Sequence, residues 1–360
     1  MEKFAFLIHP IELQDIYRKC GLFKYLPKTF LAKIMCHLPP FKVSKITNVK
    51  STFAEVEGWF IGVPLTTEMM MTMDEDKVIQ KIIDAGKIAE GLGAKILGLG
   101  AYTAIVGDAG HTVANNLNIP VTTGNTYTVA SAFEAIKEAS RLLKREIEES
   151  EIAIVGANGS IGKVCGELAC RNTKKVKLIG TDLERLQKLK RNFMFKYAGC
   201  DIGCSTSIKE GLSTADIVIT VTNSIVEVIY PGDIKSGAIV CDVARPRDVS
   251  KAVQASRKDV LVIEGGVIQP PTGIEFNFNF GFPSGLAYAC MAETMILTME
   301  KRYENFSLGR DIDINKVDEI SKLAAKHDFS LAGLRSFEKV INREYLQEVL
   351  INIKEIQEAK

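Results

Sequence analysis

The chain has 360 residues, of which 46% are hydrophobic and 25% charged, and its net charge is +1. This composition is typical of a globular protein with room for two cores, and it argues against a general nucleic-acid-binding protein. No apolar run reaches the length of a membrane span, and the eight scattered cysteines favour a reducing compartment without a metal site. We therefore expect a cytoplasmic protein.

The residues before the centre of the chain predict a domain of strands and helices. Apolar spacing places strands at 4–8, 43–49 and 54–62, and helices at 12–20, 28–37 and 76–92. The glycines of the run 98–104 favour close backbone approach, which we place at the floor of an interdomain cleft. A helix at 126–149 should bridge two domains, and Asn125 and Thr126 before its apolar stripe are candidate N-caps or polar groups facing a cofactor.

The run Glu151-Ile-Ala-Ile-Val-Gly-Ala-Asn-Gly-Ser-Ile-Gly162 reads as a buried strand, a glycine turn and the start of a helix. In a dinucleotide-binding unit, Gly156 permits the turn, Gly159 admits a pyrophosphate and Gly162 lets the helix pack close to the strand. The free N–H groups at the helix start would hold the phosphates. The predicted cofactor-binding residues of this turn are Gly156, Asn158, Gly159, Ser160, Ile161 and Gly162.

Strands and helices continue to alternate after the glycine turn. We predict strands at 176–180, 201–205, 217–221, 238–243 and 260–264, with helices at 183–191 and 208–213. This alternation predicts a doubly wound parallel sheet that binds its ligand at the carboxyl ends of the strands. Thr222 follows the fourth of the sheet's strands, counted from the one before the glycine turn, and should lie near the nicotinamide.

The predicted fold class is α/β, with a parallel Rossmann sheet and an N-terminal α/β substrate domain completed by C-terminal helices. The expected divisions are 1–125 for acyl or substrate binding, 126–149 for the bridge, 150–268 for the dinucleotide and 269–360 for the C-terminal helical segment. That last segment contains a helix that opens at 283–285 and runs to about 303, a second at 315–327 and a third at 338–359. We expect it to carry the nucleophile and to pack back on the first domain.

Residues at the end of the second sheet strand bear on the choice between NADPH and NADH. Gly180 stands where an NAD enzyme usually has an acidic residue, and this leaves room for a 2′-phosphate near the Thr181 hydroxyl. Asp182 follows, either to bind the ribose or to cap the next helix. We favour NADPH and keep NADH as the alternative.

The candidate nucleophile is Cys290, which comes early in a predicted helix after a loop of Gly and Pro. A helix N-terminus lowers the pKa of a thiol in its first turn, whereas the competing interpretation is a buried core cysteine. The four histidines have no acidic partner in a motif, which is typical of structural histidines.

Several runs of this chain occur in the same order in one enzyme family. They lie at 98–105, 122–128, 155–162, 264–267, 289–293 and 305–310, and the most specific are Thr122-Thr-Gly-Asn-Thr-Tyr-Thr128 and Ala289-Cys-Met-Ala-Glu293. On these runs the protein resembles, over nearly its whole length, the cyanobacterial-type long-chain acyl-[acyl-carrier-protein] reductases. It departs from them at Thr181, where those enzymes usually carry a basic residue for the 2′-phosphate. The resemblance does not cover the residues beyond the last of the runs, including 338–359.

The resemblance implies that NADPH reduces an acyl thioester to a fatty aldehyde through a nucleophile that falls on Cys290. The acyl donor would be acyl carrier protein or acyl-CoA, and a second enzyme could consume the aldehyde. The oxyanion would require donors such as the backbone of 98–100 or the side chains of Asn125 and Thr126. Residues 276–282 and the first domain could line an acyl tunnel.

Charge suggests where an acidic carrier protein would bind. Residues 1–50 hold nine Lys and Arg residues against three acidic ones. Such a basic face attracts an acidic partner, although charge alone favours an ordinary solvated face. Lys24, Lys28 and Lys33 are the residues whose charge reversal tests the idea.

Two other functions fit the same architecture. One is a shikimate-dehydrogenase-like or glutamyl-tRNA-reductase-like NADP-dependent oxidoreductase acting on a small substrate, which would tolerate Cys290→Ser. The other is a catalytically silent NAD(P)-sensing protein, which would bind the dinucleotide without forming an acyl adduct.

Overall fold

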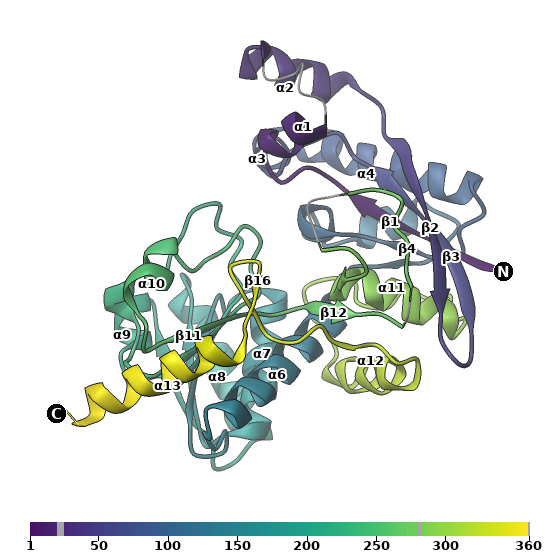
Figure 1. Ribbon diagram of the computed structural model, residues 1–360. Coiled ribbons are helices and arrows are strands. Elements are labelled where there is room, and N and C mark those ends of the chain that lie inside the picture. The colour runs from purple at the N-terminus through teal and green to yellow at the C-terminus, as the bar shows by residue number, and fades with distance from the viewer. Residues whose placement is uncertain (20–24, 272, 280–282, 359–360) are drawn as a thin grey trace. The chain divides into compact units, whose positions relative to one another are not determined.

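The computed structural model describes residues 1–19, 25–271, 273–279 and 283–358 (Figure 1). The chain divides into two compact units, of which the first comprises Met1–Tyr127 and Ile268–Ser330. The second comprises Thr128–Val267 and Leu331–Lys360, so residues 331–360 belong with it, whereas the sequence-based division keeps 269–360 together. Each unit contains its own sheet and helices, which confirms the α/β class.

The first unit is built on a mixed five-stranded sheet in the order β2-β3-β1-β4-β5. Its strands are β1 (Glu2–Ile8), β2 (Phe41–Lys50), β3 (Glu55–Gly62), β4 (Leu97–Gly98) and β5 (Val121–Thr122). All neighbours are parallel except β2 and β3. Because β1 lies between two strands and its residues 4–7 are buried, it reads as one continuous apolar run.

Helices complete this unit around a continuous apolar core. They are α1 (Leu13–Lys19), α2 (Lys28–His37), α3 (Thr67–Thr72), α4 (Glu75–Gly91), the 3-10 helix η2 (Ala101–Ala104), α5 (His111–Asn115), α11 (Ala289–Met299) and α12 (Ile314–Lys326). Helix α4 begins where Asp74 accepts the backbone N–H of Lys77, and it buries the predicted face that includes Val78 and Ile82. Helices from the C-terminal part of the chain thus complete the N-terminal unit, as predicted.

The second unit is a six-stranded parallel sheet in the order β11-β10-β9-β6-β7-β8. The strands are β6 (Glu151–Val155), β7 (Lys175–Ile179), β8 (Asp201–Ser205), β9 (Ile217–Thr220), β10 (Ile239–Asp242) and β11 (Leu261–Glu264). Counted from β6, this is the 3-2-1-4-5-6 order of the Rossmann fold, and the order reverses between β6 and β9. A dinucleotide is expected outside the carboxyl ends of those two strands.

The remaining elements are short helices and strands around this sheet. They are α7 (Ser160–Asn172), α8 (Leu183–Lys196), α9 (Ile208–Leu212), η3 (Pro231–Asp233), α10 (Lys251–Ser256), β15 (Arg335–Ser336), β16 (Lys339–Val340) and α13 (Arg343–Glu358). Strands β12 (Val267–Gln269) and β14 (Ser330–Leu331) span the points where the chain passes between units, and β13 (Ala287–Tyr288) precedes α11. Within the described parts of the chain, no helix combines the length and hydrophobicity needed to cross a bilayer.

Three helices differ in extent from the predicted ones for local backbone reasons. Helix α6 (Asn125–Leu142) ends before the predicted residue 149 because Lys144 adopts a left-handed φ of 52°. Helix α11 likewise ends at Met299, and Lys301 has a φ of 53°. The last helix starts at Arg343 because a hairpin with positive φ at Phe337 and Glu338 occupies 335–340.

Candidate cofactor and catalytic sites

The glycine turn of the second unit forms a backbone cradle at the topological switch point. Gly156 has a φ of 90°, and a Cβ there would lie 2.9 Å from the carbonyl oxygen of Val221, just past β9. A Cβ on Gly162 would lie 2.2 Å from the Gly156 carbonyl oxygen, so α7 packs directly on the turn. Gly159 precedes α7, has no side-chain cap and is exposed, and Ser160 and Ile161 begin the helix beside it. The first N–H groups of α7 are therefore available for phosphate.

Asn158 connects the glycine turn to the end of the second sheet strand. Its side-chain amide accepts the N–H of Asp182 at 3.0 Å and donates to the Asp182 carbonyl oxygen at 3.2 Å. A Cβ on Gly180 would lie 2.2 Å from the Asn158 Oδ1. Asn158 therefore occupies the space beside Gly180 that the sequence predicts to be free for a 2′-phosphate. It also closes the position at which NAD enzymes usually carry an acidic side chain.

The Asp182 carboxylate caps helix α8. It accepts the backbone N–H of Arg185 at 3.0 Å and lies 3.1 Å from the guanidinium Nε of the same residue. Of the two roles predicted for Asp182, capping is the one for which the structure provides partners. Both side chains are exposed, so Arg185 places a solvent-accessible cation one helical turn from the strand end.

Thr222 follows β9 and is held by a buried carboxylate that sequence reasoning missed. Asp248 accepts hydrogen bonds from the Thr222 hydroxyl, from its N–H at 2.9 Å and from the Thr220 hydroxyl at 2.5 Å. Asp248 is fully buried, so these hydrogen bonds compensate its loss of solvent. These hydrogen bonds fix Thr222 just past the end of β9, and its hydroxyl hydrogen is already donated to Asp248.

Cys290 is the second residue of α11 and packs against a glycine from a distant part of the chain. Gly124 has a φ of 75°, and a Cβ there would lie 2.2 Å from both the Cα and the Cβ of Cys290. Gly124 immediately precedes α6, so the starts of α6 and α11 meet at the thiol residue. The two most specific runs of the sequence thus form one site.

A buried carboxylate, Glu293, organises the residues around this contact. It is fully buried on α11, one turn after the thiol, and accepts hydrogen bonds from the hydroxyls of Thr122 and Thr126. It also accepts the backbone N–H of Tyr127 at 2.9 Å and the hydroxyl of Ser307 at 2.8 Å. Four donors from two segments converge on one carboxylate, which holds residues 122–127 against α11.

Desolvation and charge keep the Cys290 thiol protonated. Burial first, and then the negative charge of Glu293, raise its pKa to about 12, whereas the backbone N–H groups of Met291 and Cys290 act in the opposite direction. The helix start thus stabilises the thiolate as expected, but desolvation outweighs it. The thiol residue itself is half-buried, between solvent and core.

Two of the four histidines, His9 and His327, have partners at both ring nitrogens. His9 donates from Nδ1 to the Pro10 carbonyl oxygen at 2.9 Å and accepts the Tyr102 N–H at Nε2, and burial lowers its pKa to about 4. His327 contacts Ser51 at 2.8 Å and Glu300 at 2.5 Å. Neither ring has a nitrogen left for acid–base chemistry.

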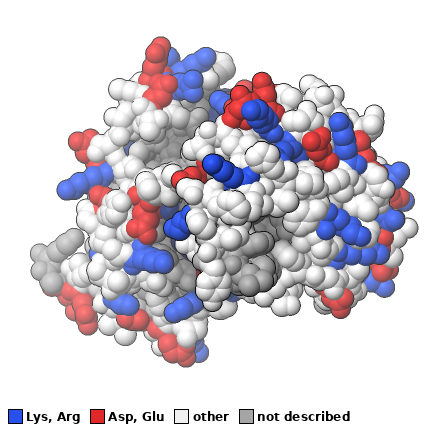
Figure 2. Space-filling model, turned by 90° about the horizontal axis from the view of Figure 1, so that it is seen from above, with Lys and Arg blue, Asp and Glu red and all other residues white. Residues whose placement is uncertain are grey.

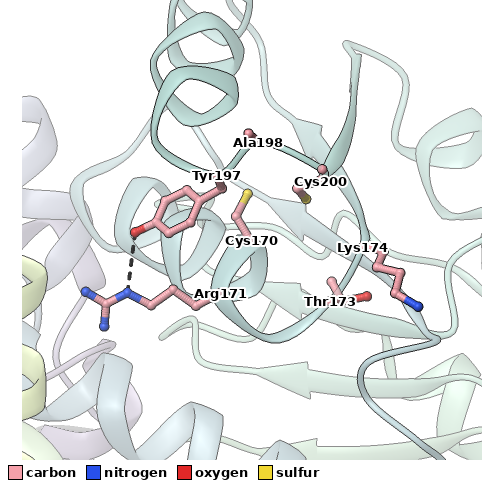
Figure 3. Close-up of a pocket in the computed structure, with 8 residues that line it drawn as sticks. Cys170, Arg171, Thr173, Lys174, Tyr197, Ala198 and Cys200 are labelled. Carbon is pink, nitrogen blue, oxygen red and sulfur yellow. Dashed lines mark hydrogen bonds between the residues drawn. The ribbon is translucent and has the colours of Figure 1, made fainter.

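A hollow in the second unit lies at the other end of α7 from the glycine turn (Figure 3). It is lined by Cys170, Arg171, Thr173, Lys174, Tyr197, Ala198, Gly199 and Cys200. Tyr197 accepts the Nε–H of Arg171 at 3.3 Å, and burial raises the pKa of both thiols. Because it lies at the last turn of α7, this hollow is separate from the cradle at the first turn. Among the residues that the structure places, no cluster of His, Cys, Asp and Glu could hold a metal ion.

The basic N-terminal stretch includes an exposed helix with an apolar stripe. Lys28 and Lys33 are exposed on α2, and so are Phe30, Ile34 and Leu38, whereas Lys24 lies outside the described residues. Leu31 and Met35 on its opposite side are buried. Charges of both signs are interspersed on the face of the molecule drawn in Figure 2.

The fold and the cradle define an NAD(P)-dependent oxidoreductase-like chain. The sequence profile of the shikimate/quinate 5-dehydrogenase family matches residues 137–264, which include the glycine turn. The chain is also 26% identical over 338 residues to the long-chain acyl-[acyl-carrier-protein] reductase of Synechococcus elongatus, covering 90% of this chain and 96% of that protein. It is distantly related to that reductase.

A second relative is much longer than this chain. The aminotransferase PigE of Serratia sp. is 30% identical over 317 residues, which are 86% of this chain and 36% of PigE. The chain thus spans about a third of that relative's length. Among solved structures, the L-tryptophan dehydrogenase of Nostoc punctiforme aligns with 100% of this chain and 89% of its own, at 13% identity and a TM-score of 0.40.

Proposed function

We propose that the protein reduces a long-chain acyl thioester to a fatty aldehyde with NAD(P)H, through a covalent acyl group on Cys290. The observation that carries this proposal is the contact of Cys290 with Gly124, which unites the two most specific runs of the sequence at a helix start. The similarity to the Synechococcus elongatus reductase over nearly the full length of both chains supports it.

The chain's own residues account for the first chemical step. The sulfur of Cys290 adds to the thioester carbonyl carbon, the donor's carbon–sulfur bond breaks, and the donor leaves as a thiol that takes the proton. One thioester replaces another, so the exchange is nearly balanced in free energy. Because the thiol pKa is about 12, only a small fraction is ionised at neutral pH, so the proton must leave as the sulfur attacks.

The cradle of the second unit fits a dinucleotide. Gly156 and Gly162 leave no space for side chains, and the uncapped start of α7 offers N–H groups to a pyrophosphate. When bound, NAD(P)H supplies the hydride that releases the acyl group as an aldehyde and returns Cys290 to its thiol. Ser160, Ile161 and Thr222 complete the set of residues that would hold it.

The residues that follow β7 support NADPH over NADH as the cofactor. Asn158 fills the space beside Gly180, and the Asp182 carboxylate is engaged in capping α8. The exposed guanidinium of Arg185 could then pair with a 2′-phosphate close to the Thr181 hydroxyl. A basic residue at 185 would compensate for the Thr181 departure from the family pattern.

An acyl carrier protein is the partner that α2 suits. Its exposed lysines and its apolar stripe would receive an acidic helix, while acyl-CoA remains the alternative donor. Charge reversal at Lys28 and Lys33 should raise the KM for the carrier-bound substrate, whereas reversal at the exposed Lys87 and Lys322 should not. An unchanged KM would exclude this docking face.

The decisive experiment is incubation with a long-chain acyl thioester, followed by intact mass measurement and assay of the aldehyde with NADPH. We expect an acyl adduct on the wild type, no adduct on Cys290→Ala, and a normal adduct on the matched control Cys204→Ala. An adduct that survives in Cys290→Ala contradicts the proposal.

The shikimate-dehydrogenase-like alternative rests on the family match at 137–264. That match covers the dinucleotide-binding part and says nothing about the substrate. Under this alternative, Cys290→Ser would keep full turnover of a small hydroxy or oxo acid, and the acyl adduct would be absent from the wild type.

A further inference from the structure

We propose that the side-chain amide of Asn125 is the hydrogen-bond donor that stabilises the oxyanion formed when Cys290 is acylated. The inference rests on the proposed thiol chemistry, and it assigns a residue to a role that thioester exchange requires. As sulfur adds to the carbonyl carbon, the carbonyl oxygen gains negative charge, which only preorganised donors can stabilise in a desolvated site.

Three other donors of the neighbouring segments already have partners. The Thr126 hydroxyl hydrogen is donated to Glu293. In the glycine-rich run after β4, the Leu99 N–H donates to the Thr122 carbonyl oxygen at 2.8 Å, and the Gly100 N–H donates to the Thr103 hydroxyl at 3.1 Å. Because a hydroxyl and a backbone N–H each provide one hydrogen, none of the three remains for a substrate.

Asn125 differs from these groups because its donor is buried without a partner. The residue is 5% exposed, and the amide Nδ2 makes no hydrogen bond within the structure. An unsatisfied buried amide lowers stability because it has lost its hydrogen bonds to water, so proteins rarely leave one without a reason. The missing partner is what a substrate oxygen would supply.

The position of Asn125 brings this donor to the thiol. A Cβ on the preceding Gly124 would lie 2.2 Å from the Cα of Cys290. Adding a bond of about 1.5 Å and one Cα–Cα step of about 3.8 Å, the Cα atoms of Asn125 and Cys290 are at most about 7.5 Å apart. An asparagine side chain spans part of that distance, and a carbonyl group bonded to the sulfur spans the rest.

Two features of the fold fix the amide there. Asn125 is the first residue of the 18-residue helix α6, whose N-terminal dipole favours negative charge. The next two residues are tied to Glu293 through the Thr126 hydroxyl and the Tyr127 N–H. The donor is thus held in place before the substrate arrives, as oxyanion stabilisation requires.

The test compares two reactions of Cys290, only one of which creates an oxyanion. A p-nitrophenyl ester of hexanoic acid acylates the thiol through a tetrahedral oxyanion and releases p-nitrophenol, whereas iodoacetamide alkylates it by displacement of iodide. Neither reaction uses NAD(P)H. The acylation rate is measured by stopped-flow absorbance of the released p-nitrophenol, and the alkylation rate by intact mass. The proteins compared are the wild type, Asn125→Ala, the isosteric Asn125→Asp and the control Asn116→Ala.

We expect both Asn125 variants to acylate about 10²–10³-fold more slowly than the wild type. The rate at which iodoacetamide alkylates Cys290 in Asn125→Ala should stay within about threefold of the wild-type rate, because no oxyanion forms in that reaction. Asn116→Ala should match the wild type in both reactions.

Three results would overturn the inference. The first is an unchanged acylation rate in Asn125→Asp. The second is an equal loss of the acylation and alkylation rates, which would indicate a structural role for Asn125. The third is a wild-type protein that iodoacetamide labels at Cys290 but that the ester does not acylate. Failure of the proposed function is distinguishable, since it would appear as normal ester acylation without any aldehyde from the acyl thioester and NADPH.

Discussion

The cradle in the second unit and the Glu293 cluster in the first (Glu293 with Thr122, Thr126, Tyr127 and Ser307) both present hydrogen-bond donors to a negatively charged group. They are built in opposite ways. The cradle consists of consecutive residues, 156–162, and presents backbone N–H groups that any suitable glycine turn provides. The cluster joins Glu293 to groups that are 166 to 171 residues away in the sequence, and to the Ser307 hydroxyl 14 residues away. A local backbone site has a sequence signature, whereas a site of distant side chains does not.

The largest expected effect is that of Gly124→Ala, which tests how tightly the distant side-chain site is packed. The added methyl would collide with the backbone of Cys290 at a φ of 75°, so we expect unfolding free energy to fall by about 2–6 kcal/mol and acylation to be lost. Denaturant titration measures the first effect and intact mass the second.

Gly93→Ala is the matched control for that substitution. Gly93 has a similar φ of 83°, but its Cβ would meet only the Lys3 side chain at 3.9 Å. Backbone strain alone should lower the free energy of unfolding of Gly93→Ala by about 1–2 kcal/mol and leave the acylation of Cys290 intact. Equal losses in the two variants would show that the Gly124 contact with Cys290 carries no special weight.

Glu293→Gln tests the carboxylate that holds the side-chain site together. The amide replaces an acceptor of four hydrogen bonds with a group that brings hydrogens of its own, so we expect a loss of about 2–4 kcal/mol. Removal of the negative charge should also lower the pKa of Cys290, because that charge raises it.

Alkylation of Cys290 as a function of pH measures that second effect. In the wild type, the rate should rise about tenfold per pH unit from 7 to 10 without a plateau, because the thiolate fraction grows up to a pKa of about 12. The Glu293→Gln profile should move to lower pH, and the exposed control Glu68→Gln should not move. A wild-type plateau below pH 9 would contradict the desolvated environment.

Gly162→Ala perturbs the local backbone site alone. A methyl 2.2 Å from the Gly156 carbonyl oxygen would push α7 away from the turn, so the Kd for NADPH should rise about 10- to 100-fold. Alkylation of Cys290 should be unchanged, since the two sites belong to different units. Fluorescence titration of NADPH provides the measurement, and unchanged affinity would remove the cradle from the cofactor site.

The smallest expected effect is that of Arg185→Ala on cofactor choice. Loss of the guanidinium should lower kcat/KM for NADPH about tenfold and leave that for NADH nearly unchanged. The exposed Lys188→Ala on the same helix is the control. A wild type that prefers NADH would end the NADPH proposal.

The parts of the fold that depend on local pattern could be predicted from the sequence. The parallel sheet of the second unit follows from the alternation of strand and helix, and the glycine turn lies where its spacing predicted. The glycines at 98–100 do approach other residues closely, since a Cβ on Gly98 would lie 2.2 Å from the Thr294 hydroxyl oxygen.

What the sequence could not predict depends on long-range partners. Nothing in the run 122–128 indicates that its hydroxyls donate to Glu293, because that carboxylate comes from a helix near the other end of the chain. Asp248 was missed for the same reason, since its partners Thr220 and Thr222 lie on a different segment. The sequence signal for the Glu293 contacts was that the runs 122–128 and 289–293 occur together in one enzyme family.

The desolvated thiol described above has a consequence for the lifetime of the protein between turnovers. Peroxides oxidise thiolates, and a sulfhydryl that ionises only near pH 12 presents almost none of that form in a cell. Cys290 should therefore survive oxidative stress that would inactivate a low-pKa cysteine enzyme.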